Sequence, residues 1–178
     1  MVPVNQWIKI KAPATVANMV CGFDILGFAV NNPYDEMEMR LVARAAGQAS
    51  ITIINIDDYN LPTDPEKNVA GAALLAMIEE YTANSIIEKS LAGNHEASSI
   101  INEDKNSPKE IVEKNEFVDF SKIGFEVKIN KLIKPGSGVG SSAASSAGAV
   151  VGANYLLGNP FSKDDLVRFA MNGEKVAS

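Results

Sequence analysis

The chain has 178 residues, a formal net charge of -6 and a sequence pI near 4.8. An acidic chain repels phosphate backbones at long range, so these values argue against a nucleic-acid partner. Hydrophobic residues make up 46% of the chain, but no uncharged run has the length of a membrane span, which argues against a membrane protein. One cysteine, Cys21, excludes an internal disulfide, and no signal-peptide pattern opens the sequence, so we expect a cytoplasmic protein.

The first third of the chain has the composition and alternation of β-strands. The pattern predicts strands over Trp7–Lys11, Phe28–Val30, Glu36–Val42 and Ile51–Ile56. Between the first two, Ala14–Gly27 is rich in turn formers, among them Asn18 and Asp24, and we expect it to be irregular.

A helix is predicted next. Asp64 and Pro65 have the residue types of an N-cap and a first helical position, and apolar residues recur at helical spacing over Asn68–Tyr81. The following residues, about 82–121, are polar and weakly patterned, which indicates a long insertion. Within it we expect partial helix near Ser85–Leu91 and Pro108–Lys114.

The C-terminal third alternates again between strand and helix. Phe125–Ile129 is predicted as a strand, and Ser142–Leu157 as a helix that ends at Gly158. Ser162 is the expected cap of a last helix over Lys163–Met171. The order of strands, helix, strand, helix and helix favours an α+β fold over a doubly wound sheet.

A glycine-rich loop joins the last predicted strand to the helix behind it. Glycines at alternate positions can adopt positive φ and let a ligand approach the backbone, and the N-terminus of the next helix presents unpaired N–H groups with partial positive charge. Phosphate oxygens fit such a site. We therefore predict a phosphate-holding loop made of Pro135, Gly136, Ser137, Gly138, Val139, Gly140, Ser141 and Ser142.

Two better-known phosphate loops do not fit this segment. Gly140 is followed by Ser141 rather than by lysine, which excludes a Walker A loop, and the G-x-G-x-G spacing is not the G-x-G-x-x-G of a Rossmann loop. A flexible Gly/Ser linker is the alternative, but the loop continues directly into an alanine-rich helical pattern.

Two motifs resemble one enzyme family. P-x-x-G-x-G-S-S-A at Pro135–Ala143 resembles the phosphate loop of the GHMP kinases, and Lys11–Val30 resembles the A-P-A-T-x-A-N-x-G-x-G-F-D-x-L-G segment of homoserine kinases within that superfamily. Met19, Val20 and Cys21 depart from the usual form. The matching positions are Ala12, Pro13, Ala14, Thr15, Ala17, Asn18, Gly22, Phe23, Asp24, Leu26 and Gly27.

The resemblance implies a fold and an activity. The fold is a ribosomal-protein-S5-domain-2-like nucleotide-binding domain, here residues 1–178 with the insertion at about 82–121, truncated before a ferredoxin-like second domain. The implied activity is ATP-dependent phosphorylation of the L-homoserine hydroxyl to O-phospho-L-homoserine, in threonine biosynthesis, by a homodimer. Another small alcohol as acceptor, or an inactive nucleotide-binding fragment, remain as alternatives.

The resemblance also assigns roles at the acceptor. Asn18 and Asp24 are the homoserine-binding positions, and turn formation is the alternative explanation for both residues. Asp24 counts as a catalytic candidate, either as a base or as a group that positions the substrate hydroxyl.

At the nucleotide, the family pattern places a magnesium ligand at Glu174, paired with a loop serine. A solvated charge at a helix end is the other explanation for Glu174. Ser142 is the predicted serine and a second catalytic candidate, with Ser141 as the alternative. Asn68 matches a position near the adenine, and ordinary helix surface is the other explanation for it.

Overall fold

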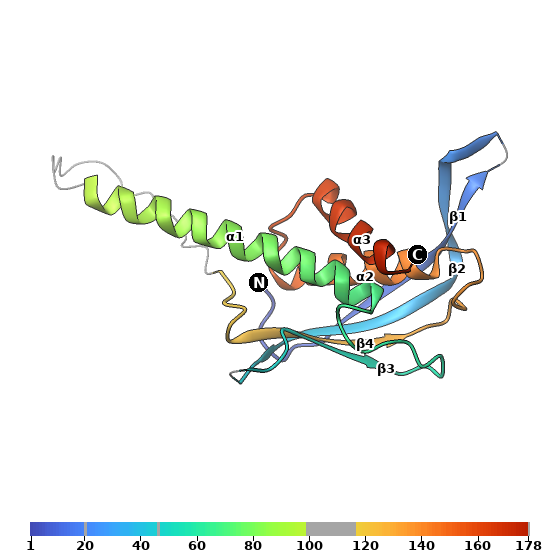
Figure 1. The fold of residues 1–178 in the computed structure, drawn as a ribbon, viewed down its shortest axis with the longest axis horizontal. Helices are drawn as coiled ribbons and strands as arrows, with labels where there is room; N and C mark the ends of the chain where they lie inside the picture. The colour runs from blue at the N-terminus through green and yellow to red at the C-terminus, as the bar shows by residue number, and fades with distance from the viewer. Residues whose placement is uncertain (20, 46, 99–116, 178) are drawn as a thin grey trace.

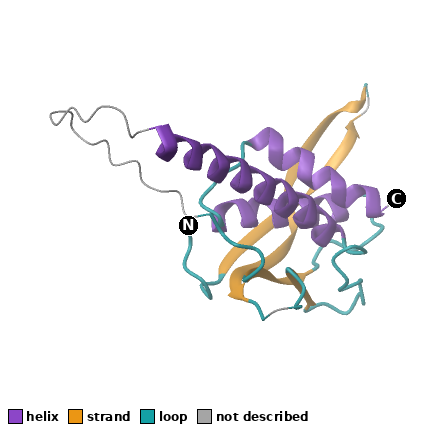
Figure 2. Ribbon diagram, turned by 60° about the vertical axis from the view of Figure 1, so that its left-hand side comes forward, coloured by secondary structure: helices purple, strands orange, loops and turns teal. Residues whose placement is uncertain are grey.

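The computed structural model of this chain describes residues 1–19, 21–45, 47–98 and 117–177, without the side chains of residues 18–19, 22–24 and 92–98. In these ranges, one four-stranded sheet carries three helices on one face (Figures 1 and 2). The elements are β1 (Ile8–Met19), β2 (Gly22–Ala43), β3 (Ile51–Asn55), α1 (Val69–Ser98), β4 (Ile123–Asn130), α2 (Ser141–Leu156) and α3 (Lys163–Ala177).

The sheet is mixed, with the strand order β1-β2-β4-β3. β2 pairs antiparallel with both β1 and β4, whereas β3 runs parallel to β4. Two parallel neighbours need a crossover connection, and α1 provides it on the covered face of the sheet. Strands and helices thus follow each other as the sequence predicts, and the α+β class is confirmed.

Strand alternation sends the apolar side chains towards the helices. Met37, Met39 and Leu41 of β2 are fully buried, whereas Glu38 and Arg40 between them lie on the other face. The core between sheet and helices also contains Ile51, Ile53, Leu74, Met77, Phe125, Val127, Ile129, Ala149, Ala153, Leu156 and Phe169.

The segment Ala14–Gly27 differs from the prediction of an irregular turn. It forms a paired arm in which Thr15 lies opposite Ala29 and Ala17 opposite Gly27, and the arm projects beyond the helices (Figure 1). Register shifts interrupt the pairing after Pro13 and after Ala17. Ladder hydrogen bonds between the two segments outweigh the turn preference of single residues, so the predicted short strands merge into longer ones.

α1 begins later than predicted. Its N-cap is Asn68, whose Oδ1 accepts the N–H groups of Ala70 at 2.9 Å and Gly71 at 3.3 Å. Asp64 instead stabilises the preceding turn by accepting the N–H of Glu66 at 3.1 Å. Asparagine and aspartate can both cap a helix, and only the tertiary structure decides at which of the two residues the helix begins.

α1 also ends later than predicted. It continues through Ser85–Leu91 as far as Ser98, in a stretch without proline, and extends past the body of the molecule (Figure 1). The predicted helix near Pro108–Lys114 lies outside the described residues.

The last helix starts at its predicted cap. Ser162 and Asp165 form reciprocal bonds, since Asp165 N–H donates to Ser162 Oγ at 3.3 Å and Ser162 N–H donates to Asp165 Oδ2 at 3.1 Å. α3 then runs beyond Met171 to Ala177, so Glu174 stands on the helix. None of the helices in the described ranges combines the length and apolar character required to cross a bilayer.

Candidate functional site

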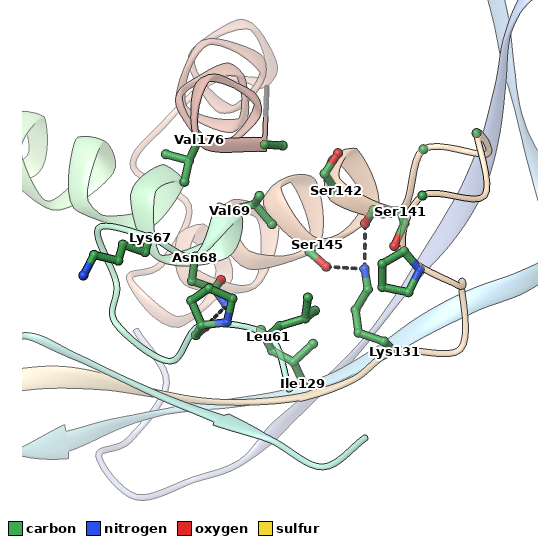
Figure 3. Close-up of a pocket in the computed structure, with 16 residues that line it drawn as sticks. Leu61, Lys67, Asn68, Val69, Ile129, Lys131, Ser141, Ser142, Ser145 and Val176 are labelled. Atoms are coloured by element: carbon green, nitrogen blue, oxygen red, sulfur yellow. Dashed lines mark hydrogen bonds between the residues drawn. The ribbon is translucent and has the colours of Figure 1, made fainter. Parts of the chain in front are cut away.

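A cleft of about 510 Å³ lies between the glycine loop and the starts of α1 and α2 (Figure 3). The end of α3 contributes Val176, and the end of β4 contributes Ile129. The predicted loop and helix residues on its wall are Asn68, Pro135, Gly136, Gly138, Gly140, Ser141 and Ser142.

The three loop glycines all have left-handed backbone angles. Their φ values are 73° at Gly136, 78° at Gly138 and 72° at Gly140. A Cβ at Gly136 or Gly138 would have no atom within 4 Å, whereas one at Gly140 would lie 2.1 Å from Thr15 Oγ1. The first two glycines thus leave open space beside the backbone, and the third lets the loop pass close to β1.

The start of α2 leaves backbone N–H groups without partners inside the helix. Gly140 is its N-cap, no side chain caps it, and its first turn holds no acidic residue. Ala144 N–H makes the first intrahelical bond, to the Gly140 carbonyl at 2.9 Å. The N–H groups of the first turn and the positive end of the helix dipole therefore lie at the wall of the cleft, a favourable place for an anion.

The two loop serines have different partners. Ser141 is buried and donates to the Ile133 carbonyl at 3.0 Å, so its hydroxyl is turned towards the chain. Ser142 donates to Glu174 Oε2 at 3.1 Å across the junction of α2 and α3. The structure thus brings the predicted pair of Ser142 and Glu174 together.

The donor set of this pair suits a hard cation. A search of the described residues finds no group of three His, Cys, Asp or Glu side chains that could hold a metal by themselves. Magnesium in nucleotide enzymes takes one or two protein oxygens and completes its shell with phosphate and water. A serine hydroxyl beside one carboxylate fits that pattern.

Asn68 lies on the wall of the cleft, and its side chain already makes hydrogen bonds that stabilise the fold. Besides capping α1, its Nδ2 donates to the Pro62 carbonyl at 2.6 Å. An amide nitrogen carries two hydrogens, so a second donor remains beyond this bond. The structure therefore places Asn68 as a buried cap rather than as ordinary helix surface.

Three predicted residues with described side chains, Ser137, Val139 and Glu174, do not line the cleft. Val139 packs instead on an apolar cluster beneath the loop, and Glu174 lies beside Ser142. Asn18 and Asp24 lie on the β1–β2 arm, and their side chains are outside the described residues.

Sequence reasoning missed a buried ion pair beside the loop. The side chains of Lys131 and Asp35 are 3% and 0% exposed, and Lys131 Nζ lies 2.5 Å from Asp35 Oδ2. Lys131 lines the cleft, and its Nζ also donates to Ser145 Oγ (Figure 3). Asp35 sits in N-N-P-Y-D-E and Lys131 follows a predicted strand, and no local sequence pattern marks either charge as buried.

Comparison with known proteins gives a consistent family. Residues 106–178 match the family model described as GHMP kinases N terminal domain. The chain is 35% identical over 168 residues to "Homoserine kinase" of Chlorobium phaeobacteroides (strain BS1), and 33% identical over 171 residues to "Homoserine kinase" of Methanococcus vannielii. These alignments cover 93% and 96% of this chain.

A solved structure is similar to this chain in sequence and in fold. The crystal structure of homoserine kinase from Cytophaga hutchinsonii is 36% identical, covers 99% of this chain and superposes with a TM-score of 0.66. The chain spans 42% and 43% of the two curated relatives and 44% of the crystallised protein. The fold is thus that of the N-terminal part of a GHMP kinase.

Proposed function

We propose that this chain, which resembles the N-terminal part of homoserine kinases, is the nucleotide-binding part of an enzyme that phosphorylates the L-homoserine hydroxyl with ATP. The carrying observation is the cleft formed by three left-handed glycines and the uncapped start of α2. The choice of homoserine as the acceptor follows from the names of the relatives, because the cleft itself does not specify an acceptor.

The proposal extends to domain organisation and setting. We propose that residues 1–178 form the N-terminal nucleotide-binding domain, with an insertion at about 82–121. We propose a cytoplasmic homodimer that acts on a small molecule, with neither nucleic acid nor membrane as partner.

Phosphoryl transfer requires positioning and charge neutralisation more than covalent chemistry. In the proposed arrangement, N–H groups of Gly136–Ser142 and the α2 dipole hold the β- and γ-phosphates of ATP. Asn68 also lines the cleft, and in this arrangement its second amide hydrogen would be donated to the adenine.

Glu174 and Ser142 are the proposed magnesium ligands. The hydroxyl and the carboxylate already lie 3.1 Å apart, so little rearrangement is needed to direct both oxygens at one cation. A magnesium ion held by these two residues would neutralise charge on the phosphates during transfer.

Asn18 and Asp24 are the proposed homoserine-binding residues on the β1–β2 arm. Asp24 can accept a hydrogen bond from the attacking hydroxyl, or pair with the substrate ammonium, and Asn18 can both donate and accept. We assign Asp24 a positioning role, in which it orients the hydroxyl towards the γ-phosphate.

The test compares acceptors. Phosphorylation of L-homoserine, mevalonate and galactose is followed in a coupled assay, with this chain alone and fused to the C-terminal part of a curated relative. We expect turnover with L-homoserine in the fused form, and loss of that turnover with retained ATP binding in Asp24→Asn. Turnover of another alcohol in place of homoserine would identify a different GHMP kinase, and ATP binding without any turnover would identify a nucleotide-binding fragment.

A further inference from the structure

We propose that the buried pair of Asp35 and Lys131 is a clamp that joins the two ends of the glycine loop and holds the loop in its anion-binding shape. The inference concerns the positioning of the loop. It rests on the proposed function only for the identity of the ligand, a nucleoside triphosphate.

The clamp holds the entry to the loop through the carboxylate of Asp35. Oδ1 of Asp35 accepts the N–H of Leu132 at 3.0 Å and the N–H of Ile133 at 2.9 Å. These two residues lead from β4 into the loop. Asp35 itself belongs to β2, so the contact ties the start of the loop to a central strand of the sheet.

The clamp holds the exit from the loop through the ammonium group of Lys131. Nζ donates to Asp35 Oδ2, to the Ser141 carbonyl at 2.7 Å and to Ser145 Oγ at 2.8 Å. An ammonium group has three hydrogens, and these three bonds use all of them. Ser141 and Ser145 lie in the first two turns of α2, so the lysine ties the start of that helix to the same carboxylate.

A stabilising role alone does not explain this arrangement. A buried ion pair pays for the dehydration of both charges, and apolar residues of similar size often stabilise a core equally well. The pair fixes the position of the glycine loop, because its hydrogen bonds reach the chain segments on both sides of that loop. The glycines between those flanks give the loop backbone freedom that a ligand would otherwise have to remove on binding.

A second ion pair between β2 and β4 provides a matched control. Arg40 of β2 and Glu126 of β4 form a cross-strand pair at 2.6 Å, on the face of the sheet away from the helices. Their side chains are 28% and 18% exposed, and the arginine stacks on Trp7. This pair has similar chemistry but no contact with the glycine loop.

The experiment measures amide hydrogen exchange in the ligand-free chain, together with Mg·ATP affinity by calorimetry. Lys131→Met removes the exit contacts, and Asp35→Asn weakens the lysine contact while keeping an acceptor for the entry. We expect exchange of amides 134–144 to accelerate about tenfold or more in both variants, with β4 and α1 unchanged. Arg40→Met should leave the loop at the wild-type rate, and Mg·ATP affinity should fall about tenfold in the clamp variants only.

A single variant that leaves one buried charge without its partner can unfold the chain. The double variant Asp35→Asn with Lys131→Met removes both charges, and it should fold while its loop exchanges faster. Loop exchange like that of Arg40→Met, or an equal acceleration over the whole chain, would overturn the clamp. If the wild-type chain binds no Mg·ATP but the exchange pattern is as expected, the clamp stands and the proposed function fails.

Discussion

At the scale of single residues, Gly140 combines a left-handed φ with close contact to a neighbouring strand. Gly140→Ala should cost about 1–2 kcal/mol for the backbone conformation and about 1–3 kcal/mol more for the collision with Thr15. Urea denaturation of the wild type and of Gly140→Ala measures the total loss in the free energy of unfolding.

Gly136→Ala is the matched control for this prediction. Gly136 has nearly the same φ, 73° against 72°, but open space at the position of a Cβ. It should lose only the backbone contribution, about 1–2 kcal/mol. Equal losses in the two variants would show that the contact between Gly140 and Thr15 is not close in solution.

Substitutions of the two loop serines should have different effects, one on metal binding and the other on stability. Ser142→Ala removes the hydroxyl beside Glu174, and we expect it to raise the Mg²⁺ concentration for half-maximal ATP binding roughly 10- to 100-fold. Calorimetric titration of ATP at graded Mg²⁺ concentrations measures this shift.

Ser141→Ala serves as the control, because its hydroxyl donates to the Ile133 carbonyl. It should lower stability by about 1 kcal/mol and leave the Mg²⁺ dependence unchanged. A larger shift in Mg²⁺ dependence for Ser141→Ala than for Ser142→Ala would contradict the choice of Ser142.

At the scale of elements, Gly173 allows α3 to approach both other helices. A Cβ at this position would lie 2.1 Å from Ser146 Oγ of α2 and 2.3 Å from the Val69 carbonyl oxygen of α1. This close packing also places the neighbouring Glu174 at Ser142.

Gly173→Ala should therefore destabilise the chain by about 1–3 kcal/mol, since a backbone carbonyl cannot move aside. In Gly148→Ala of α2, the nearest obstacle is the flexible end of Met37, at 2.8 Å, so a smaller loss is expected. Thermal denaturation of both variants compares them. A greater loss in Gly148→Ala would mean that the three-helix junction is looser than described.

Arg168 of α3 links its own helix to α1. It contacts Glu80 Oε2 at 2.5 Å and Asp165 Oδ1 at 2.9 Å. The hydrogen bond from Arg168 lowers the pKa of Glu80 below its usual 4.5, and hydrogen bonds from Ser162 and then from Arg168 lower the pKa of Asp165. The folded state therefore favours both carboxylates in their charged form.

A carboxyl group with a lowered folded-state pKa stabilises the fold above its ordinary pKa, and that contribution is lost as the pH falls through the lowered value. Glu80→Gln should thus reduce the urea midpoint at pH 7, by a small amount because the pair is solvent-exposed. The difference from the wild type should shrink as the pH falls below 4.5 and through the lowered pKa of Glu80. Equal differences at pH 7 and pH 3 would show that the ion pair contributes nothing.

At the scale of the whole molecule, a ligand that binds only the folded chain stabilises all of it. With Mg·ATP at 100 times its dissociation constant, the free energy of unfolding should rise by about 2.7 kcal/mol. The melting temperature at several nucleotide concentrations measures this increase. Gly140→Ala should lose most of the response, and inorganic sulfate at equal ionic strength controls for general salt effects.

Features encoded within a few neighbouring residues were predictable. The glycine loop with its following helix, the Ser162 cap and the order of strands and helices depend on hydrogen bonds and backbone preferences within one or two turns of chain. The resemblance of the loop and of Lys11–Val30 to GHMP kinases is likewise a property of contiguous residues.

Features that depend on distant segments were decided only by the tertiary structure. The arm over Ala14–Gly27 becomes strand because its two halves pair with each other, and Asn68 caps α1 because the helix begins only after the turn that Asp64 stabilises. Local preference alone favoured the other outcome in both cases.

The sequence by itself therefore determined the loop and indicated the class of ligand proposed for it, because both inferences depend on adjacent residues. The fold decided which side chains support that loop: Ser142 meets Glu174 only where α2 and α3 pack, and Asp35 meets Lys131 across 96 positions of chain. A charge becomes a buried partner only when the surrounding elements remove it from water, and no local pattern records that event.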